Sequence, residues 1–502
     1  MHVHMRTRLF ATSLLFSFAA LIGCGGGSSL VGQGPGLGNA SNNALLQGQY
    51  AFALSGQDSN GPFFAAGSFT ADGQGHLGGI EDVNSNSLPT NGTAVRFSGT
   101  YAIGSDGRGN AVIGLQPGCP NWQFTIESHA HALLTCLNTH ITGSGTIDLQ
   151  DPTAFTASAL KGNYVFGFSG VGVSGGLAVS AGSWSMDGVG NVGSGEMDVN
   201  DFGTVLQATP LNGTYTIANT GRGTATISSS YATQNFVIYV VNATDFKFVE
   251  IDRTTTAPIL SGEVLKQAPG PFSVSSLNGQ YAFTLSGADA NNFPLALGGL
   301  LPADGAGNIV SGVLDSNDGG SPALGSAISG PYTVSTAGRG LATLTSAVFS
   351  FPLAFYPAAN GTIELVNVGG NFVASGMAKG QSGGPFGLHS MTGNYAINFS
   401  GTNLGSNLSG PTEEDISGQL SGDGAGNLTG VLDINNFGAI FQGLSLSSSS
   451  YTMVPTGRGS ASVNTATGTF AMQTYQIDPN TVLFLDADTN RVMVGIGEKQ
   501  QF

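Results

Sequence analysis

The stretch "LQGQYAFALSG" at residues 46–56 occurs four times along the chain in related forms. Its sister copies read "LKGNYVFGFSG" at 160–170, "LNGQYAFTLSG" at 277–287 and "MTGNYAINFSG" at 391–401. A repeat of somewhat over 100 residues is too long for a propeller blade or a β-helix coil, and each copy can bury a core of its own. The chain is therefore predicted to contain four tandem domains.

Shared motifs subdivide each repeat in the same order. The predicted repeats span residues 45–150, 160–267, 277–381 and 391–502, with nine-residue linkers at 151–159, 268–276 and 382–390. An Asp-Gly-x-Gly motif begins at Asp72, Asp187, Asp304 and Asp423; an Asp-x-Asn motif follows at Asp82/Asn84, Asp198/Asn200, Asp315/Asn317 and Asp433/Asn435; a Gly-Arg-Gly motif contains Arg108, Arg222, Arg339 and Arg458; and each repeat ends near Gln150, Gln267, Gln381 or Gln500.

About eight short strands are expected in each repeat. In the second they are roughly 164–169, 181–186, 191–197, 213–218, 223–228, 235–241, 246–252 and 261–266, separated by Gly, Asn and Asp. Strands joined in sequence by tight turns favour an antiparallel up-and-down meander, and closure into a barrel removes its exposed edges. The predicted fold class is all-β, with a barrel favoured and a two-sheet β-sandwich as the alternative.

The opening L-x-G-x-Y strand and the strand count resemble the small barrels of the avidin and lipocalin class. That resemblance implies up-and-down topology. It leaves open a role as a small-ligand carrier, with a pocket in the mouth of each barrel.

Composition narrows the class of function. The chain has 79 glycines in 502 residues, but only 9% of its residues are charged while 40% are hydrophobic, which suits an exported all-β protein with many turns. The formal net charge is −16, and an acidic surface of this kind repels phosphate backbones and anionic lipid. Nucleic-acid binding is therefore not expected.

Residues 1–23 have the parts of an export signal: Arg6 and Arg8, then an apolar run over 9–22 that is too short to span a bilayer. The end of this segment, Leu21-Ile22-Gly23-Cys24, resembles the lipobox of bacterial lipoproteins. The resemblance implies acylation of Cys24 after cleavage. Because Gly25 rather than Asp follows, it also implies an outer-membrane or cell-surface location. Residues 24–44 would then form the lipidated cysteine and a flexible tether.

The Asp-Gly-x-Gly motif has three interpretations. In the first two repeats the spacing matches G-x-G-x-x-G, but strand-like residues follow where a dinucleotide site needs a helix. Calcium binds 6–8 oxygens, and the motif supplies one carboxylate, to which the later Asp-x-Asn could add. The favoured interpretation is a hairpin turn, because Asp-Gly supplies positive φ at little cost.

The recurring arginine could bind an anion at a barrel mouth, because a guanidinium suits carboxylates. The favoured interpretation is structural, with the arginine stacked in a turn or paired with the Asp-x-Asn carboxylate.

Further motifs in the first two repeats have weaker interpretations. His129, His131 and His140 could hold a metal, but solvated histidines at a hairpin tip are favoured. A turn near residues 127–128 would bring Cys119 and Cys136 together, and an exported protein favours a disulfide there. "GVSGG" at 172–176 matches G-x-S-x-G, but the second repeat contains no histidine to complete a triad.

The sequence thus predicts a membrane-anchored, non-catalytic structural or adhesive binding protein with no cofactor and no bound metal. Its expected partners are the bilayer, through acylated Cys24, and a protein, glycan or small molecule.

Overall fold

The computed structural model describes residues 42–87, 92–114, 117–252, 258–347, 349–405 and 411–502. The expected signal segment, Cys24 and most of the tether lie outside these ranges. Within them, none of the helices has the length and apolar character needed to cross a bilayer.

Each repeat folds as an antiparallel barrel, and in the first three every strand pairs with the next and the last pairs with the first. The predicted barrel is confirmed, and the sandwich alternative is wrong. Barrel 1 consists of β1 (Gln47–Asp58), β2 (Gly61–Asp72), β3 (His76–Ser85), β4 (Gly92–Ile103), β5 (Arg108–Gly114), β6 (Asn121–Ser128), β7 (His131–Leu137) and β8 (Ile141–Leu149). Barrel 2 consists of β9 (Gly162–Val171), β10 (Leu177–Met186), β11 (Asn191–Asp201), β12 (Thr204–Ile217), β13 (Arg222–Ser229), β14 (Thr233–Asn242), β15 (Asp245–Glu250) and β16 (Ile259–Lys266).

The other two barrels repeat this order. Barrel 3 consists of β17 (Asn278–Asp289), β18 (Pro294–Asp304), β19 (Asn308–Asp318), β20 (Ser321–Val334), β21 (Gly340–Ser346), β22 (Ser350–Pro357), β23 (Thr362–Asn367) and β24 (Phe372–Gly380). Barrel 4 consists of β25 (Thr392–Asn403), β26 (Thr412–Asp423), β27 (Asn427–Asn436), β28 (Ala439–Ser445), β29 (Ser449–Met453), β30 (Arg458–Thr465), β31 (Gly468–Asp478), β32 (Thr481–Asp486) and β33 (Arg491–Lys499).

Barrel 4 departs from its sisters at one strand. The long strand represented by β4, β12 and β20 is divided there into β28 and β29, and both pieces pair with β27. The barrel still closes, because β26 pairs with β27 as well as with β25.

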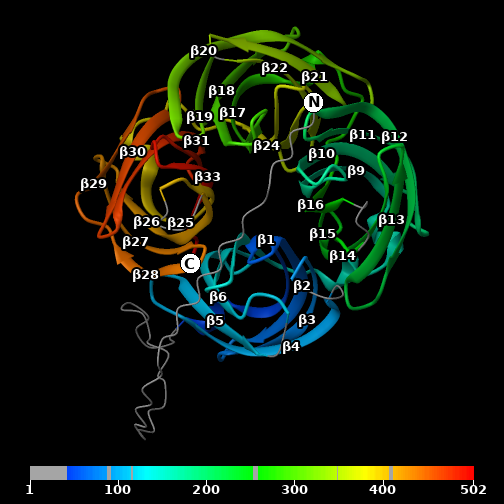
Figure 1. The fold of residues 1–502 in the computed structure, drawn as a ribbon, viewed down its shortest axis with the longest axis horizontal. Coiled ribbons are helices and arrows are strands. Elements are labelled where there is room, and N and C mark those ends of the chain that lie inside the picture. The colour runs from blue at the N-terminus through cyan, green and yellow to red at the C-terminus, as the bar shows by residue number, and fades with distance from the viewer. Residues whose placement is uncertain (1–41, 88–91, 115–116, 253–257, 348, 406–410) are drawn as a thin grey trace, which may run out of the picture.

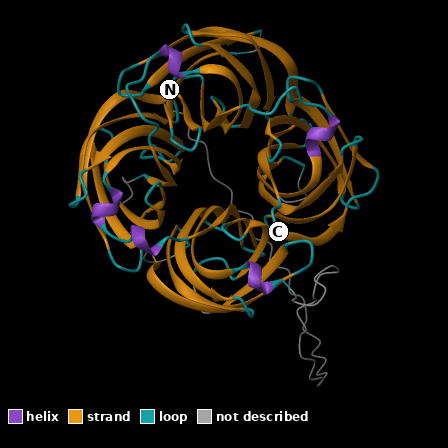
Figure 2. Cartoon of the chain, turned by 180° about the vertical axis from the view of Figure 1, so that it is seen from behind, coloured by secondary structure: helices purple, strands orange, loops and turns teal. Residues whose placement is uncertain are grey.

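The four barrels lie side by side in a ring, in chain order, so that barrel 4 returns to barrel 1 (Figure 1). We call each contact between neighbouring barrels a seam. Five short 3-10 helices, distributed around the ring (Figure 2), precede the opening strands. They are η1 (Asn43–Leu45), η2 (Pro152–Ala154), η3 (Ala157–Leu160), η4 (Val274–Ser276) and η5 (Leu388–Met391).

Aromatic side chains fill the barrel interiors. In barrel 1, Trp122 packs against Phe52, Phe69 and Phe97 with ring centroids 4.7–6.0 Å apart. In barrel 2, Phe166 stacks on Trp184 at 4.4 Å. Both tryptophans are therefore core residues.

Glycine in the opening motif has a packing role. In the four Ser-Gly pairs, an added Cβ on the glycine would lie 1.8–2.2 Å from a backbone oxygen of the barrel's last strand. The first and last strands therefore approach too closely there for any side chain. These glycines are Gly56, Gly170, Gly287 and Gly401.

Candidate functional site: the seams of the ring

The Asp-Gly-x-Gly motif forms the turn between the second and third strands of every barrel. In barrel 3, the Asp304 carboxylate accepts hydrogen bonds from the backbone N–H groups of Ala306 and Asn308 and from the Asn308 side chain, at 2.7–2.9 Å. Its two glycines have φ values of 69° and 102°, which favour glycine. Hydrogen bonds of this kind lower the pKa of Asp72 and Asp187 to about 2. Each carboxylate is thus engaged by its own turn.

The Asp-x-Asn and Gly-Arg-Gly motifs meet at the seams. Arg339 of barrel 3 forms a two-pronged ion pair with Asp198 of barrel 2, at 2.8 and 2.6 Å. The Tyr356 hydroxyl donates to the same carboxylate at 2.5 Å, and the Asp198 side chain is completely buried. Each carboxylate therefore belongs to one barrel and its arginine to the next. The matching sets are Arg222, Tyr239 and Asp82 at the first seam and Arg458, Tyr475 and Asp315 at the third.

The asparagine of each Asp-x-Asn motif reaches across the same seam. The Asn317 amide donates to the backbone carbonyls of Asp486, Asp488 and Arg491, at 2.8–3.0 Å, in the loop between β32 and β33. Its oxygen accepts from the Gly320 N–H in its own hairpin. Asn200 and Asn435 repeat this pattern with three carbonyls each. The motif thus docks onto a loop of the following barrel.

Apolar residues support the first three seams. Val237, Tyr239 and Val249 of barrel 2 pack against Phe64 and Ala66 of barrel 1 in a buried cluster. Matching clusters lie between barrels 2 and 3 and between barrels 3 and 4. The run "FVIYVV" in β14 is therefore buried on both faces, one against its own core and one against barrel 1.

The seam between barrels 4 and 1 closes the ring with different contacts. Arg108 contacts Asp433 at 3.1 Å and also Asp106 at 2.8 Å. The tyrosine position holds Thr125, whose buried hydroxyl has no hydrogen-bond partner among the described residues, and Gln123 donates to Asp433 instead. Thr142 and Ser144 of barrel 1 donate to the buried Asp415 carboxylate at 2.6 and 2.7 Å. Ion pairs and hydrogen bonds therefore make up much of the contact at this seam.

The closing glutamines also cross the seams. Gln150 donates to the carbonyl of Val240, and Gln267 to that of Ala337. Gln500 ends barrel 4 and donates to the carbonyls of Asp106 and Ile126 in barrel 1. The last residues of the chain thus help to close the ring.

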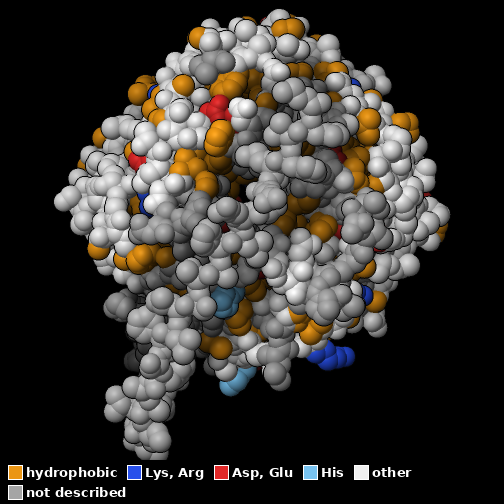
Figure 3. All heavy atoms as spheres, in the orientation of Figure 1, with side chains coloured by type: hydrophobic (Ala, Val, Ile, Leu, Met, Phe, Trp, Pro, Cys, Tyr) orange, Lys and Arg blue, Asp and Glu red, His pale blue; other side chains and the backbone are white. Residues whose placement is uncertain are grey.

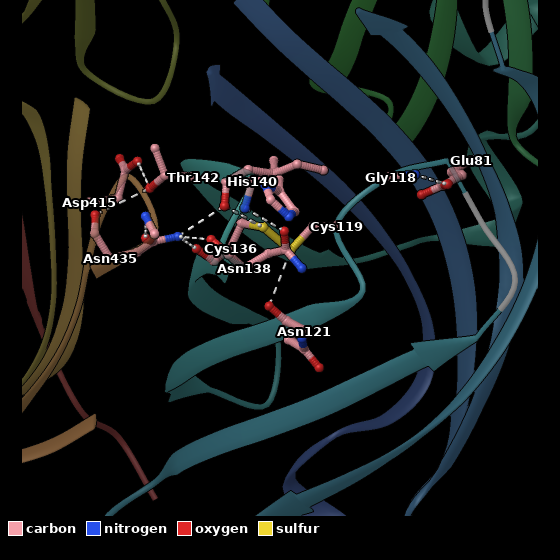
Figure 4. Close-up of a disulfide and its surroundings, with 12 residues drawn as sticks. Glu81, Gly118, Cys119, Asn121, Cys136, Asn138, His140, Thr142, Asp415 and Asn435 are labelled. Atoms are coloured by element: carbon pink, nitrogen blue, oxygen red, sulfur yellow. Dashed lines mark hydrogen bonds between the residues drawn. A yellow bond between two sulfur atoms is a disulfide. The ribbon is translucent and has the colours of Figure 1, made fainter. Parts of the chain in front are cut away.

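Cys119 and Cys136 form a disulfide in barrel 1, beside the closing seam (Figure 4). The Cys136 carbonyl accepts from Asn435 of barrel 4 at 2.8 Å. The hairpin turn between β6 and β7 lies at His129 and Ala130, two residues later than the sequence predicts.

His131 departs from the expected solvated group, whereas His129 and His140 are exposed, as the sequence predicts. His131 lies between Asp148 and Glu498 at 2.6 and 3.0 Å, which raises its pKa well above 6.5 against the opposing effect of burial. His129 instead faces the Leu45 carbonyl at 3.2 Å. Among the described residues, no group of three or more His, Cys, Asp and Glu side chains could hold a metal ion.

His131 belongs to a cluster of charges contributed by all four barrels, which we call the axial cluster. Lys247 of barrel 2 is buried and contacts Glu263 and, at 3.1 Å, Asp148 of barrel 1. Burial raises the pKa of Glu364 to about 8, although the positive charge of Lys379 of barrel 3 acts in the opposite direction. Lys379 also helps to lower the pKa of Glu498. The members are His131 and Asp148, then Asp245, Lys247 and Glu263, then Glu364 and Lys379, and finally Glu498.

The axial cluster predicts a pH dependence of stability. Burial raises the pKa of Asp245 to about 7 and that of Glu364 to about 8, so the folded ring holds protons that the unfolded chain releases near pH 4. Stability is therefore expected to fall as pH rises from 5 to 8. The raised pKa of His131 acts in the same direction, because its contribution is lost as pH rises through that pKa.

Thermal unfolding at pH 5.5 and pH 8.5 checks this, with a Tm several degrees lower at pH 8.5. Glu364→Gln should reduce the difference, because it removes one ionisation that opposes folding. A Tm that rises with pH, or an unchanged difference in the variant, contradicts the role of Glu364.

The interior of barrel 3 contains an apolar cavity of ≈ 40 Å³ between residues that include Tyr281, Tyr332 and Phe355. Pockets for small molecules are typically about 300–1,000 Å³, so this space holds at most a few waters.

No protein-family model and no curated protein matches the chain. Among solved structures, it is similar to a mutant of the vaccine antigen transferrin binding protein B from Haemophilus parasuis Hp5, at 9% identity and a TM-score of 0.21. The alignment covers 91% of this chain and 96% of that one. Transferrin binding protein B from serogroup B Neisseria meningitidis gives 8% identity and a TM-score of 0.19, over 90% and 99% of the two chains.

Proposed function

We propose that the chain is a bacterial lipoprotein, anchored through acylated Cys24, whose four barrels act as one non-catalytic structural or adhesive binding unit. The observation that carries this proposal is the repeated seam. An arginine, an aspartate and, in three seams, a tyrosine join each barrel to its neighbour. The described residues on the face in Figure 3 present few charged side chains, and such a surface suits contact with a binding partner.

The boundaries proposed for the chain before cleavage follow the repeats: a signal segment at 1–23, a tether at 24–44, and barrels at 45–150, 160–267, 277–381 and 391–502. Aromatic rings occupy the interiors of barrels 1 and 2, and the cavity of barrel 3 measures only ≈ 40 Å³, which weighs against a small-ligand carrier. Binding is therefore assigned to the outer surface.

Substitution of Cys24 by serine tests the anchor. The wild-type protein is expected in the membrane fraction, with a lipid-modified Cys24 at its N-terminus by mass spectrometry. The variant is expected in the soluble fraction, because one thioether-linked lipid anchor is lost. Substitution of Cys119 by serine is the control and should leave the protein in the membrane fraction. An unmodified N-terminus after cleavage elsewhere contradicts the proposal.

A further inference from the structure

A hollow of ≈ 540 Å³ lies on the outer surface at the seam between barrels 1 and 2. Gly78 and neighbouring residues of β2, β3 and β4 form one side, and Asn219 and Thr220 of the turn between β12 and β13 form the other. The Gln49 amide donates to the Thr220 carbonyl at 3.2 Å and joins the two sides. The hollow therefore depends on the ring, because two barrels build it.

Gly78 and Arg96 of barrel 1 both line this hollow. Gly78 leaves open space, since an added Cβ would come no closer than 3.6 Å to the Phe97 carbonyl oxygen. Counted from the Asp-Gly-x-Gly motif, the second repeat keeps a glycine here, Gly193, whereas the third and fourth have Val310 and Thr429. Arg96 sets barrel 1 apart from all three sister repeats, because Pro210, Ala327 and Leu446 occupy its place there.

Arg96 differs from the other described arginines in its ion pairing. The other five described arginines, Arg108, Arg222, Arg339, Arg458 and Arg491, each contact a carboxylate. Arg96 is exposed, lines the hollow and has no ion pair within the described residues. None of the described residues that line the hollow is acidic, although the chain has 30 acidic and 14 basic residues. An anion in contact with Arg96 would therefore meet no carboxylate among the lining residues.

The other polar groups that line the hollow indicate which further groups a ligand would carry. Thr70, Asn219 and Thr220 are exposed at the rim and offer hydroxyl and amide groups that donate and accept hydrogen bonds. A guanidinium binds a carboxylate with two parallel hydrogen bonds. We propose that this hollow binds a carboxylate-bearing sugar, with Arg96 on the carboxylate and the rim on the sugar hydroxyls. This proposal rests on the binding role proposed above and specifies the class of ligand.

Calorimetric titration of the full-length protein in detergent tests the site, with galacturonate, a galacturonate oligomer and neutral galactose as probes. Both acidic probes are expected to bind saturably, and galactose at least tenfold more weakly. Tighter binding of the oligomer would identify a polymer as the source of the sugar acid, and equal binding a free sugar acid. Affinity should fall as salt rises, because the pair is exposed.

Two variants separate charge from shape. Arg96→Met is expected to weaken galacturonate binding at least tenfold. Gly78→Val fills the hollow, keeps the charge and should also weaken binding at least tenfold. Lys161→Met, which removes an exposed positive charge outside the hollow, should stay within twofold of wild type. Unchanged binding by Arg96→Met, equal binding of galactose or no saturable binding overturns the proposal. Membrane anchoring through Cys24 is measured in a separate experiment. Failure of the sugar-binding proposal can therefore be told apart from failure of the anchoring proposal.

Discussion

Replacement of Arg339 by methionine is expected to lower the free energy of unfolding by about 3–5 kcal/mol. The substitution removes both charged hydrogen bonds to Asp198 and leaves a completely buried carboxylate with only neutral donors. The loss of the pair costs more than the pair contributes, because the stranded charge keeps its desolvation penalty. Equilibrium denaturation monitored by tryptophan fluorescence measures the change.

Arg96→Met is the matched control, since Arg96 is exposed and has no ion pair within the described chain. It should change stability by no more than about 0.5 kcal/mol. The double variant Arg339→Met with Asp198→Asn should recover part of the loss, because the amide removes the stranded charge. Equal effects of Arg339→Met and Arg96→Met would show that the seam contributes little.

Replacement of Gly287 by alanine is expected to destabilise barrel 3 by about 3 kcal/mol, near the upper end of overpacking effects. The new Cβ would lie 1.8 Å from the Val373 carbonyl oxygen, so β17 and β24 would have to separate where the barrel closes. The steric conflict is with backbone, which cannot move aside as a flexible side chain does. Thermal unfolding and protease susceptibility would report the change.

Gly380→Ala is the matched control in the same pair of strands. Its added Cβ meets only the Tyr281 ring, at 3.6 Å, an ordinary contact. We expect a Tm close to that of wild type. If Gly287→Ala were equally harmless, the closing strands would be able to separate without cost, and the recurrence of Ser-Gly would need another explanation.

The sequence was sufficient for the number of units and their class, because four copies of one strand pattern repeat at a nearly constant interval. It was also sufficient for the Asp-Gly-x-Gly turn, whose requirement for positive φ is local. The long strand β12 was predicted only from residue 213, whereas it begins at Thr204. Its first half contains exposed residues and Pro210, which resemble a loop when tertiary pairing is unknown.

The seams could not be predicted in the same way. An arginine and an aspartate recurring in each repeat suggest a pair, but nothing local determines whether both lie in one repeat or in neighbours. One signal was present: Tyr239, Tyr356 and Tyr475 each follow the Gly-Arg-Gly arginine by 17 residues. The axial cluster had no repeating pattern, because each barrel contributes different charges, and only the ring brings them together.

Closure of the ring also constrains how this protein can evolve. A linear array of repeats has free ends, so unequal recombination can add or delete a unit while the remaining contacts persist. Here each barrel has two neighbours, and Asp433 of the last barrel receives Arg108 of the first. Deletion of one unit would leave two unmatched surfaces, and insertion of one would have to change every angle between neighbours. Copy number is therefore set by geometry, and divergence is expected within the units, as Arg96 and the divided strand of barrel 4 illustrate.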